Sequence, residues 1–185
     1  LLTLVPPPDV KDKVVLIKPN ILSPKKPEAA VCTHPVVVAA TVKAFLNLGA
    51  KSVLVGESPA TANSMLAAKA TGMLEAIKRV GGTWVDFSNQ KELEFSGGKL
   101  IKSIQFAKPF FDADIIVSVA KLKTHQLMAY TGAMKNLFGL VVGLHKAQMH
   151  YRFSDKKDFA TYLTDLNIAA KPSYAIMDAI TAMEG

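Results

Sequence analysis

The stretch at 121–150, KLKTHQLMAYTGAMKNLFGLVVGLHKAQMH, concentrates the basic side chains of this sequence that could do chemistry. Between Ile115 and Ser154 there are four lysines, one arginine and three histidines, and no aspartate or glutamate. A solvated protein surface normally mixes both signs of charge. The cluster also follows an apolar run at 114–119 that is typical of a buried strand. A one-sign cluster in that position indicates a binding site for an anion.

Lys135 is the candidate catalytic amine, because it lies alone in an uncharged turn between GAM and NLFG. A second positive charge nearby lowers the pKa of a lysine, which makes its amine a better nucleophile at neutral pH. Free backbone N–H groups at the start of its helix, near 131–132, would add to an anion site. The alternative is a structural lysine that caps a helix or pairs with Asp178 or Glu184.

The histidines offer metal ligation without a recognised metal motif. His145 and His150 are five residues apart, which does not align them on one helix face. His125 is distant in sequence but could converge with them in space, so His125 and His150 are the candidate metal ligands. Solvation or helix capping is the alternative for each histidine. The sequence contains no Walker loop, dinucleotide-binding fingerprint, nucleophile elbow or zinc signature.

Strand and helix patterns alternate along the chain. Short apolar, β-branched runs predict strands at 14–17, 52–55, 83–87, 114–119 and 174–177. Periodic apolar positions predict helices at 34–48, 62–80 and 158–170, with a short helix at 108–112. Thr33 is expected to cap the helix that Pro35 opens. The alternation predicts an α/β fold with a mostly parallel sheet and helices on both faces in Rossmann-like layers. Residues 88–107 predict a short antiparallel excursion.

In such sheets, ligands bind outside the carboxyl ends of the strands. Polar residues follow each predicted strand, and we expect them to line one cleft with the catalytic pair Lys135 and His125. The alternative is that these positions are polar because loops are solvated. The expected ligand-binding residues are Lys18, Asn20, Glu57, Ser58, Lys121, Lys123, Thr124, Asn136 and Asp178.

Composition limits the remaining possibilities. Half of the 185 residues are apolar, which predicts one α/β domain over 1–185, and the absence of an initiator methionine suggests a fragment of a longer domain. The net charge of +7 favours phosphate-bearing partners, whereas no nucleic-acid-binding motif is present, so direct nucleic-acid binding is not expected. Cys32, the single cysteine, excludes an internal disulfide and a cluster held by four cysteines of this chain. No apolar run reaches the roughly 18 to 20 residues that span a bilayer, and no signal peptide opens the chain, so we expect a cytoplasmic location.

Several motifs, in order along nearly the whole chain, resemble those of the domain-of-unknown-function family 362. They are IKPN at 17–20, THP at 33–35, KLKTH at 121–125, TGAMKNLFG at 131–139 and DAI at 178–180. This family has no assigned reaction, and many of its members carry an added ferredoxin-like module. The resemblance therefore implies an iron–sulfur-associated segment or partner, although this chain lacks the cysteines to hold such a cluster itself.

A second resemblance concerns the layout of one block. The interval from His125 to Lys135 is similar to that in nickel-dependent lactate racemases, where a histidine and a lysine ten residues later hold a nickel-pincer nucleotide. The resemblance implies a metal or metal–nucleotide cofactor at these two residues, with His150 near the place of a later nickel-binding histidine. The chain departs from the racemases at Ala133 and Met134, where those enzymes are richer in glycine.

Two function hypotheses from different classes follow. The first is a domain that binds a phosphate- or carboxylate-bearing molecule at its strand ends, in its catalytic version a racemase- or oxidoreductase-like enzyme. The second is a non-catalytic scaffold that docks a ferredoxin-type electron carrier through a basic surface over 121–157. The burial of the basic side chains distinguishes the two hypotheses. An enzyme needs Lys123, His125 and Lys135 to converge in a cleft, whereas docking needs exposed cations. The cations that docking requires are Lys146, Arg152, Lys156 and Lys157.

Overall fold

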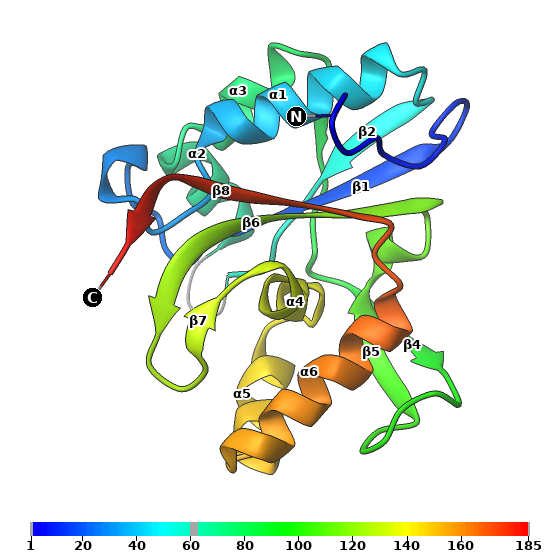
Figure 1. Cartoon of the computed structure of the whole chain (residues 1–185), viewed down its shortest axis with the longest axis vertical. Coiled ribbons are helices and arrows are strands. Elements are labelled where there is room, and N and C mark those ends of the chain that lie inside the picture. The colour runs from blue at the N-terminus through cyan, green and yellow to red at the C-terminus, as the bar shows by residue number, and fades with distance from the viewer. Residues whose placement is uncertain (1, 60–62, 185) are drawn as a thin grey trace.

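The computed structural model describes residues 2–59 and 63–184. Its main sheet has the strand order β3–β2–β1–β6–β7, and β8 pairs with the other edge of β6 (Figure 1). The strands are β1 (Val14–Pro19), β2 (Ser52–Val55), β3 (Thr83–Trp84), β6 (Ile115–His125), β7 (Ala129–Thr131) and β8 (Tyr174–Met183). All neighbouring pairs are parallel except β6 with β7.

Helices cover both faces of this sheet, which confirms the predicted α/β class. One layer contains η1 (Pro27–Ala29), α1 (Pro35–Asn47), α2 (Ser64–Ala70) and α3 (Met73–Lys78). The other contains η2 (Lys108–Phe110), α4 (Ala133–Asn136), η3 (Leu137–Leu140), α5 (Leu144–Arg152) and α6 (Lys156–Ala170). Figure 1 shows α1 to α3 on one side of β1 and β6, and α4 to α6 on the opposite side.

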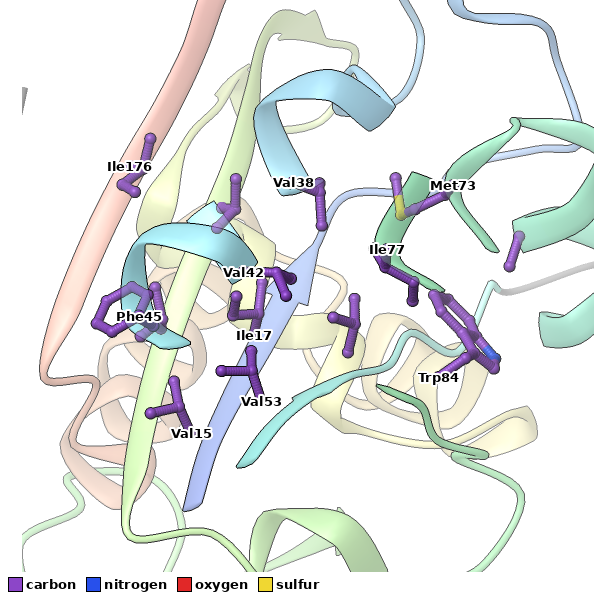
Figure 2. Close-up of a cluster of buried hydrophobic side chains, with 14 of the residues drawn as sticks. Val15, Ile17, Val38, Val42, Phe45, Val53, Met73, Ile77, Trp84 and Ile176 are labelled. Atoms are coloured by element: carbon purple, nitrogen blue, oxygen red, sulfur yellow. The ribbon is translucent and has the colours of Figure 1, made fainter. Parts of the chain in front are cut away.

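The first hydrophobic core lies beneath α1. Val38, Val42 and Phe45 recur at helical spacing and are fully buried against the β1 side chains Val15 and Ile17 (Figure 2). His34, rather than the predicted Thr33, caps this helix, since its Nδ1 accepts a hydrogen bond from the backbone of Val36 at 3.3 Å. The hydroxyl of Thr33 is already engaged, because it donates to the carbonyl of Val119 at 2.8 Å.

The second core lies on the opposite face, where Leu16 and Ile116 pack with the buried faces of η3 and α6. The predicted antiparallel excursion is confirmed there as a two-stranded sheet of β4 (Gln90–Glu94) and β5 (Ser103–Ala107). Side chains alternate between the two faces of a strand. Residue Lys18 therefore shares its face with Leu16 and points toward the layer of α4 to α6.

Four predicted strand ends are wrong, and the first of them is that of β1, which continues past residue 17 to Pro19. The sequence predicts that the central strand ends at residue 119, but β6 continues to His125, and β8 continues past Asp178 to Met183. Lys121 and Lys123 resemble loop residues, yet their ammonium groups have hydrogen-bond partners elsewhere in the chain, which allows them to lie inside a sheet. The third strand is shorter than predicted and spans only two residues.

Candidate functional site

A buried ion pair joins the carboxyl ends of β1 and β2. Lys18 is 1% exposed, and its Nζ donates to Oε2 of Glu57. The same ammonium also donates to the carbonyl of Pro19 at 2.7 Å and to Oδ1 of Asn136 at 3.1 Å. Burial lowers the pKa of Lys18, and the charge of Glu57 opposes that shift. Three acceptors thus compensate the desolvation of this ammonium.

The Glu57 carboxylate also forms an ion pair with a second lysine. Nζ of Lys146 lies 3.9 Å from Oε1 of Glu57 and donates to the carbonyl of Ser58. The backbone N–H of Ser58 in turn donates to Oε1 at 2.9 Å. Burial lowers the pKa of Lys146 to about 8, against the opposing effect of Glu57. One carboxylate therefore faces two buried amines, which leaves positive charge in excess.

Asn136 fastens the short helix α4 to the sheet. Its Nδ2 donates to the backbone carbonyl of Lys18 at 2.8 Å and to Oγ of Ser118 at 3.0 Å. The hydroxyl of Ser118 donates to the carbonyl of Ala133 at 3.1 Å, at the first residue of α4. These bonds fix the position of the neighbouring Lys135. Because α4 is a single turn of four residues, its dipole adds little to the anion site, and the contribution of free backbone N–H groups near 131–132 stays a prediction.

The remaining predicted lysines point toward the loop that leads into α1. Lys121 forms an ion pair of 2.9 Å with Asp178, whose Oδ2 also accepts from the backbone of His34. Lys123 donates to Oδ1 of Asn20 at 2.9 Å and to the carbonyl of residue 31 at 2.7 Å. The expected residues thus form two groups at the same edge of the sheet, one toward each helical layer.

Lys135 has no hydrogen-bond acceptor or counterion among the residues that the structure describes. It is half-buried, and burial together with the charges of Lys123 and Lys18 lowers its pKa to about 8. Of the alternatives for Lys135, a pair with Asp178 or with Glu184 does not form among the described residues, and the Asp178 carboxylate binds Lys121 instead. A fraction of Lys135 is consequently neutral at pH 7, which is the state that a base or nucleophile requires.

His125 lies within electrostatic range of Lys135 at the end of β6. Burial, then the charges of Lys135 and His150, lower its pKa to about 4. Its Nδ1 accepts two backbone N–H groups, from Leu127 and Met128, each at 3.2 Å. Since Nδ1 acts as an acceptor, the neutral ring carries its proton on Nε2, which makes His125 a hydrogen-bond donor to a ligand.

These contacts do not fit a metal–nucleotide cofactor held by His125. Metal binding through Nε2 would leave both ring nitrogens without a proton, because Nδ1 already accepts hydrogen bonds. His150 stacks on Phe159 with ring centroids 4.4 Å apart and packs edge-on to Phe138 at 5.3 Å. Within 2–59 and 63–184, no group of three or more His, Cys, Asp or Glu side chains could hold a metal ion.

The sequence does not predict three residues of the site. It places Lys146 on the docking surface instead. Gly139 has no side chain that could indicate a role, although it lies against the Lys18–Glu57 pair. The hydroxyl of Thr131 is buried without a hydrogen-bond partner among the described residues. It lies opposite Lys123 in the β6–β7 register, so the two side chains share one face. Thr124, a predicted ligand residue, lies on β6 and is exposed.

The chain belongs to the family described as "Domain of unknown function (DUF362)", whose match covers residues 15–185. It is 32% identical over 172 residues to "Thylakoid-associated protein sll1697" of Synechocystis sp. (strain ATCC 27184 / PCC 6803 / Kazusa). That alignment covers 92% of this chain and 53% of the relative, so the chain spans about half the length of the curated relative it matches. The relationship to lactate racemases and the iron–sulfur association stay predictions.

A crystal structure of a Thermotoga maritima protein shows a partial likeness, with a TM-score of 0.48 and 16% identity over 87% of this chain and 43% of that one. Within the part of the chain that the structure describes, no helix is both long and apolar enough to cross a membrane. The predicted cytoplasmic location is a separate matter and stays a prediction.

Amine labelling gives a direct measure of the Lys135 environment. We expect Lys135 to be half-neutral near pH 8, because burial and neighbouring cations disfavour its charged form. Acetic anhydride labelling across pH 6–11, followed by peptide mass spectrometry, should place the labelling midpoint of Lys135 near pH 8, and Lys157, which is exposed on the first turn of α6, serves as the reference for an exposed amine. A Lys135 midpoint near 10.4, the value of a free lysine, contradicts the activated-amine hypothesis.

Proposed function

We propose that this chain binds a small molecule bearing a phosphate or carboxylate at the carboxyl edge of its sheet, with Lys135 as the group that exchanges a proton with it. One observation carries the proposal: four lysine amines lie within electrostatic range of a single carboxylate, and two of them contact it. Glu57 influences the pKa of each of these amines, which belong to Lys18, Lys123, Lys135 and Lys146.

The balance of charge explains why an anion would bind there. Lys18 and Lys146 contact Glu57, whereas Lys123 has only neutral oxygen acceptors and Lys135 has no acceptor within the described ranges. Buried or half-buried positive charge without a counterion is unfavourable, so a bound anion lowers the free energy of the site. The cluster thus offers a ligand two uncompensated amines.

Hydrogen-bond donors complete the arrangement. The Nε2–H of His125 and the unpartnered hydroxyl of Thr131 belong to the residues around Lys123 and Lys135. Because the pKa of Lys135 is about 8, its amine can take a proton from a bound acid and return it near neutral pH. Proton exchange with the ligand is the chemistry that we assign to Lys135, without any step through a metal.

Docking of a ferredoxin-type carrier has less support. That hypothesis requires Lys146 to be exposed with the neighbouring cations, but Lys146 is 8% exposed and is bound to Ser58. Arg152, Lys156 and Lys157 are exposed, as many surface cations are. The docking surface therefore lacks one of the four cations that the hypothesis requires to be exposed.

Calorimetric titration with inorganic phosphate and with acetate tests the proposal. Lys135→Ala should weaken binding by roughly 1.5–3 kcal/mol, about tenfold to a hundredfold in Kd, because one charge-assisted hydrogen bond is lost. The fold should tolerate this change, since Lys135 holds no other described group in place. Lys157→Ala, which removes an exposed lysine of α6, serves as the matched control and should leave Kd within twofold.

If neither anion binds the wild-type protein at millimolar concentration, the anion site is refuted. If the two variants weaken binding equally, the effect comes from general charge and not from Lys135. Raising the salt concentration separates these cases, because an exposed lysine is screened more strongly than a half-buried one.

A further inference from the structure

An apolar groove lies between β7, α4 and α6, and Lys135 is one of the residues that line it. Its volume is about 480 Å³, and its walls include Met128, Tyr130, Met134, Leu163 and Met177. Among the described residues that line the groove, Lys135 is the one charged side chain. Figure 1 shows α4 beside β7, with α6 along the same face of the molecule.

Three large apolar side chains that line the groove are exposed. Tyr130 and Met134 are each 51% exposed, and Met177 is 36% exposed. Single exposed apolar residues are common, but three that line one concavity indicate a binding surface. Methionine side chains are flexible and polarisable, so a wall rich in methionine adapts to an aliphatic chain of variable shape.

Packing around Gly132 helps to shape the groove. A Cβ atom at Gly132 would overlap the ring and hydroxyl of Tyr130, so the tyrosine lies directly against this backbone. The other wall is formed by one face of α6, where Ala160 and Thr164 are four residues apart. A small residue at 160 leaves room between this helix and α4.

We propose that the ligand of the Lys135 site is an amphipathic anion, whose carboxylate or phosphate head lies at Lys135 and whose aliphatic chain lies in this groove. This inference rests on the anion-binding function proposed above and specifies its substrate class. The lining of the groove supports it: one lining side chain, Lys135, carries a positive charge without a described counterion, and most of the other described lining residues are apolar.

Affinity for unbranched carboxylates of increasing length tests the inference. Acetate, butyrate, hexanoate and octanoate share one head group and differ only in apolar length. Each added methylene that enters the groove should lower Kd by roughly threefold to fourfold, until the chain fills the groove. Calorimetric titration of the wild-type protein measures this series.

Two groove variants show where the chain binds. Ala160→Phe should fill the groove and lower octanoate affinity at least tenfold, while acetate affinity stays within twofold. Met134→Ala removes an exposed wall residue with little risk to folding, and it should reduce the gain per methylene. Ala147→Phe, the same substitution at an exposed position of α5, is the matched control and should change neither affinity.

The outcomes distinguish the two proposals. Failure of acetate and phosphate to bind at all overturns the anion site itself. Binding of acetate with no gain in affinity from longer chains overturns only the amphipathic ligand. A chain-length dependence that neither Ala160→Phe nor Met134→Ala alters places the chain elsewhere and also overturns the groove assignment.

Discussion

Gly139→Ala is expected to lower the free energy of unfolding by roughly 3–5 kcal/mol, the cost of disrupting a buried ion pair. A Cβ atom at this position would lie well inside 3.0 Å of Nζ of Lys18 and of Oε1 of Glu57. Neither partner can move without losing buried hydrogen bonds, because Lys18 also binds Asn136 and Glu57 also accepts from Ser58. Urea denaturation at pH 7 measures the change.

Gly72→Ala is the matched control for the glycine variant. Gly72 has a φ of 74° between α2 and α3, and a Cβ there would meet nothing within 4 Å. Its substitution should cost only the left-handed backbone penalty of roughly 1–2 kcal/mol. Equal losses in the two variants would mean that contact with the ion pair is not the reason for glycine at 139.

Glu57→Gln is expected to lower the free energy of unfolding by a similar amount, because it removes a charge and not because it adds volume. The amide has nearly the same shape, but Lys18 and Lys146 lose their shared carboxylate while they remain buried. Removal of one partner from a buried pair costs roughly 3–5 kcal/mol at neutral pH. Glu94→Gln, which changes an exposed carboxylate on β4, should remain within about 0.5 kcal/mol of wild type.

The loss in Glu57→Gln should shrink as the pH rises. Burial lowers the pKa of Lys18 and Lys146 in the folded protein, and loss of Glu57 removes the effect that opposes this shift. Between the lowered folded value and the unfolded value near 10.5, the unfolded chain binds more protons, so stability rises with pH in that window. Denaturation at pH 7 and at pH 9.5 compares the two conditions, and a loss that is equal at both would contradict a charge-based cause.

The sequence predicts the layers of this fold better than the ends of its strands. Strand–helix alternation is a local pattern, as is the apolar spacing of Val38, Val42 and Phe45, and both correspond to the structure. The continuation of β6 depends on partners far away in the chain. Asn20 lies 103 residues before Lys123, so no local pattern shows that this lysine lies in a strand.

In the candidate site, too, local sequence predicts some features and distant contacts determine others. Residue type and the lack of nearby charged residues in the sequence make Lys135 and His125 candidates, but the sequence does not show which lysines have counterions. The pairing of Lys121 with Asp178 removes one candidate cation, while Lys146 joins the cluster from α5. Pairing is a property of the folded chain, and it determines which amines remain available to a ligand.

The extension of β6 beyond β1 has a consequence for the ligand binding that we propose. Lys123 lies in a segment that pairs with Thr131 of β7 on one side and with Met183 of β8 on the other. Groups on a doubly paired strand lose little conformational entropy when a ligand arrives, unlike groups on a loop that must become ordered. The ligand should therefore bind to a preformed, rigid site. The association rate should be limited by desolvation of the ligand and not by rearrangement of the backbone.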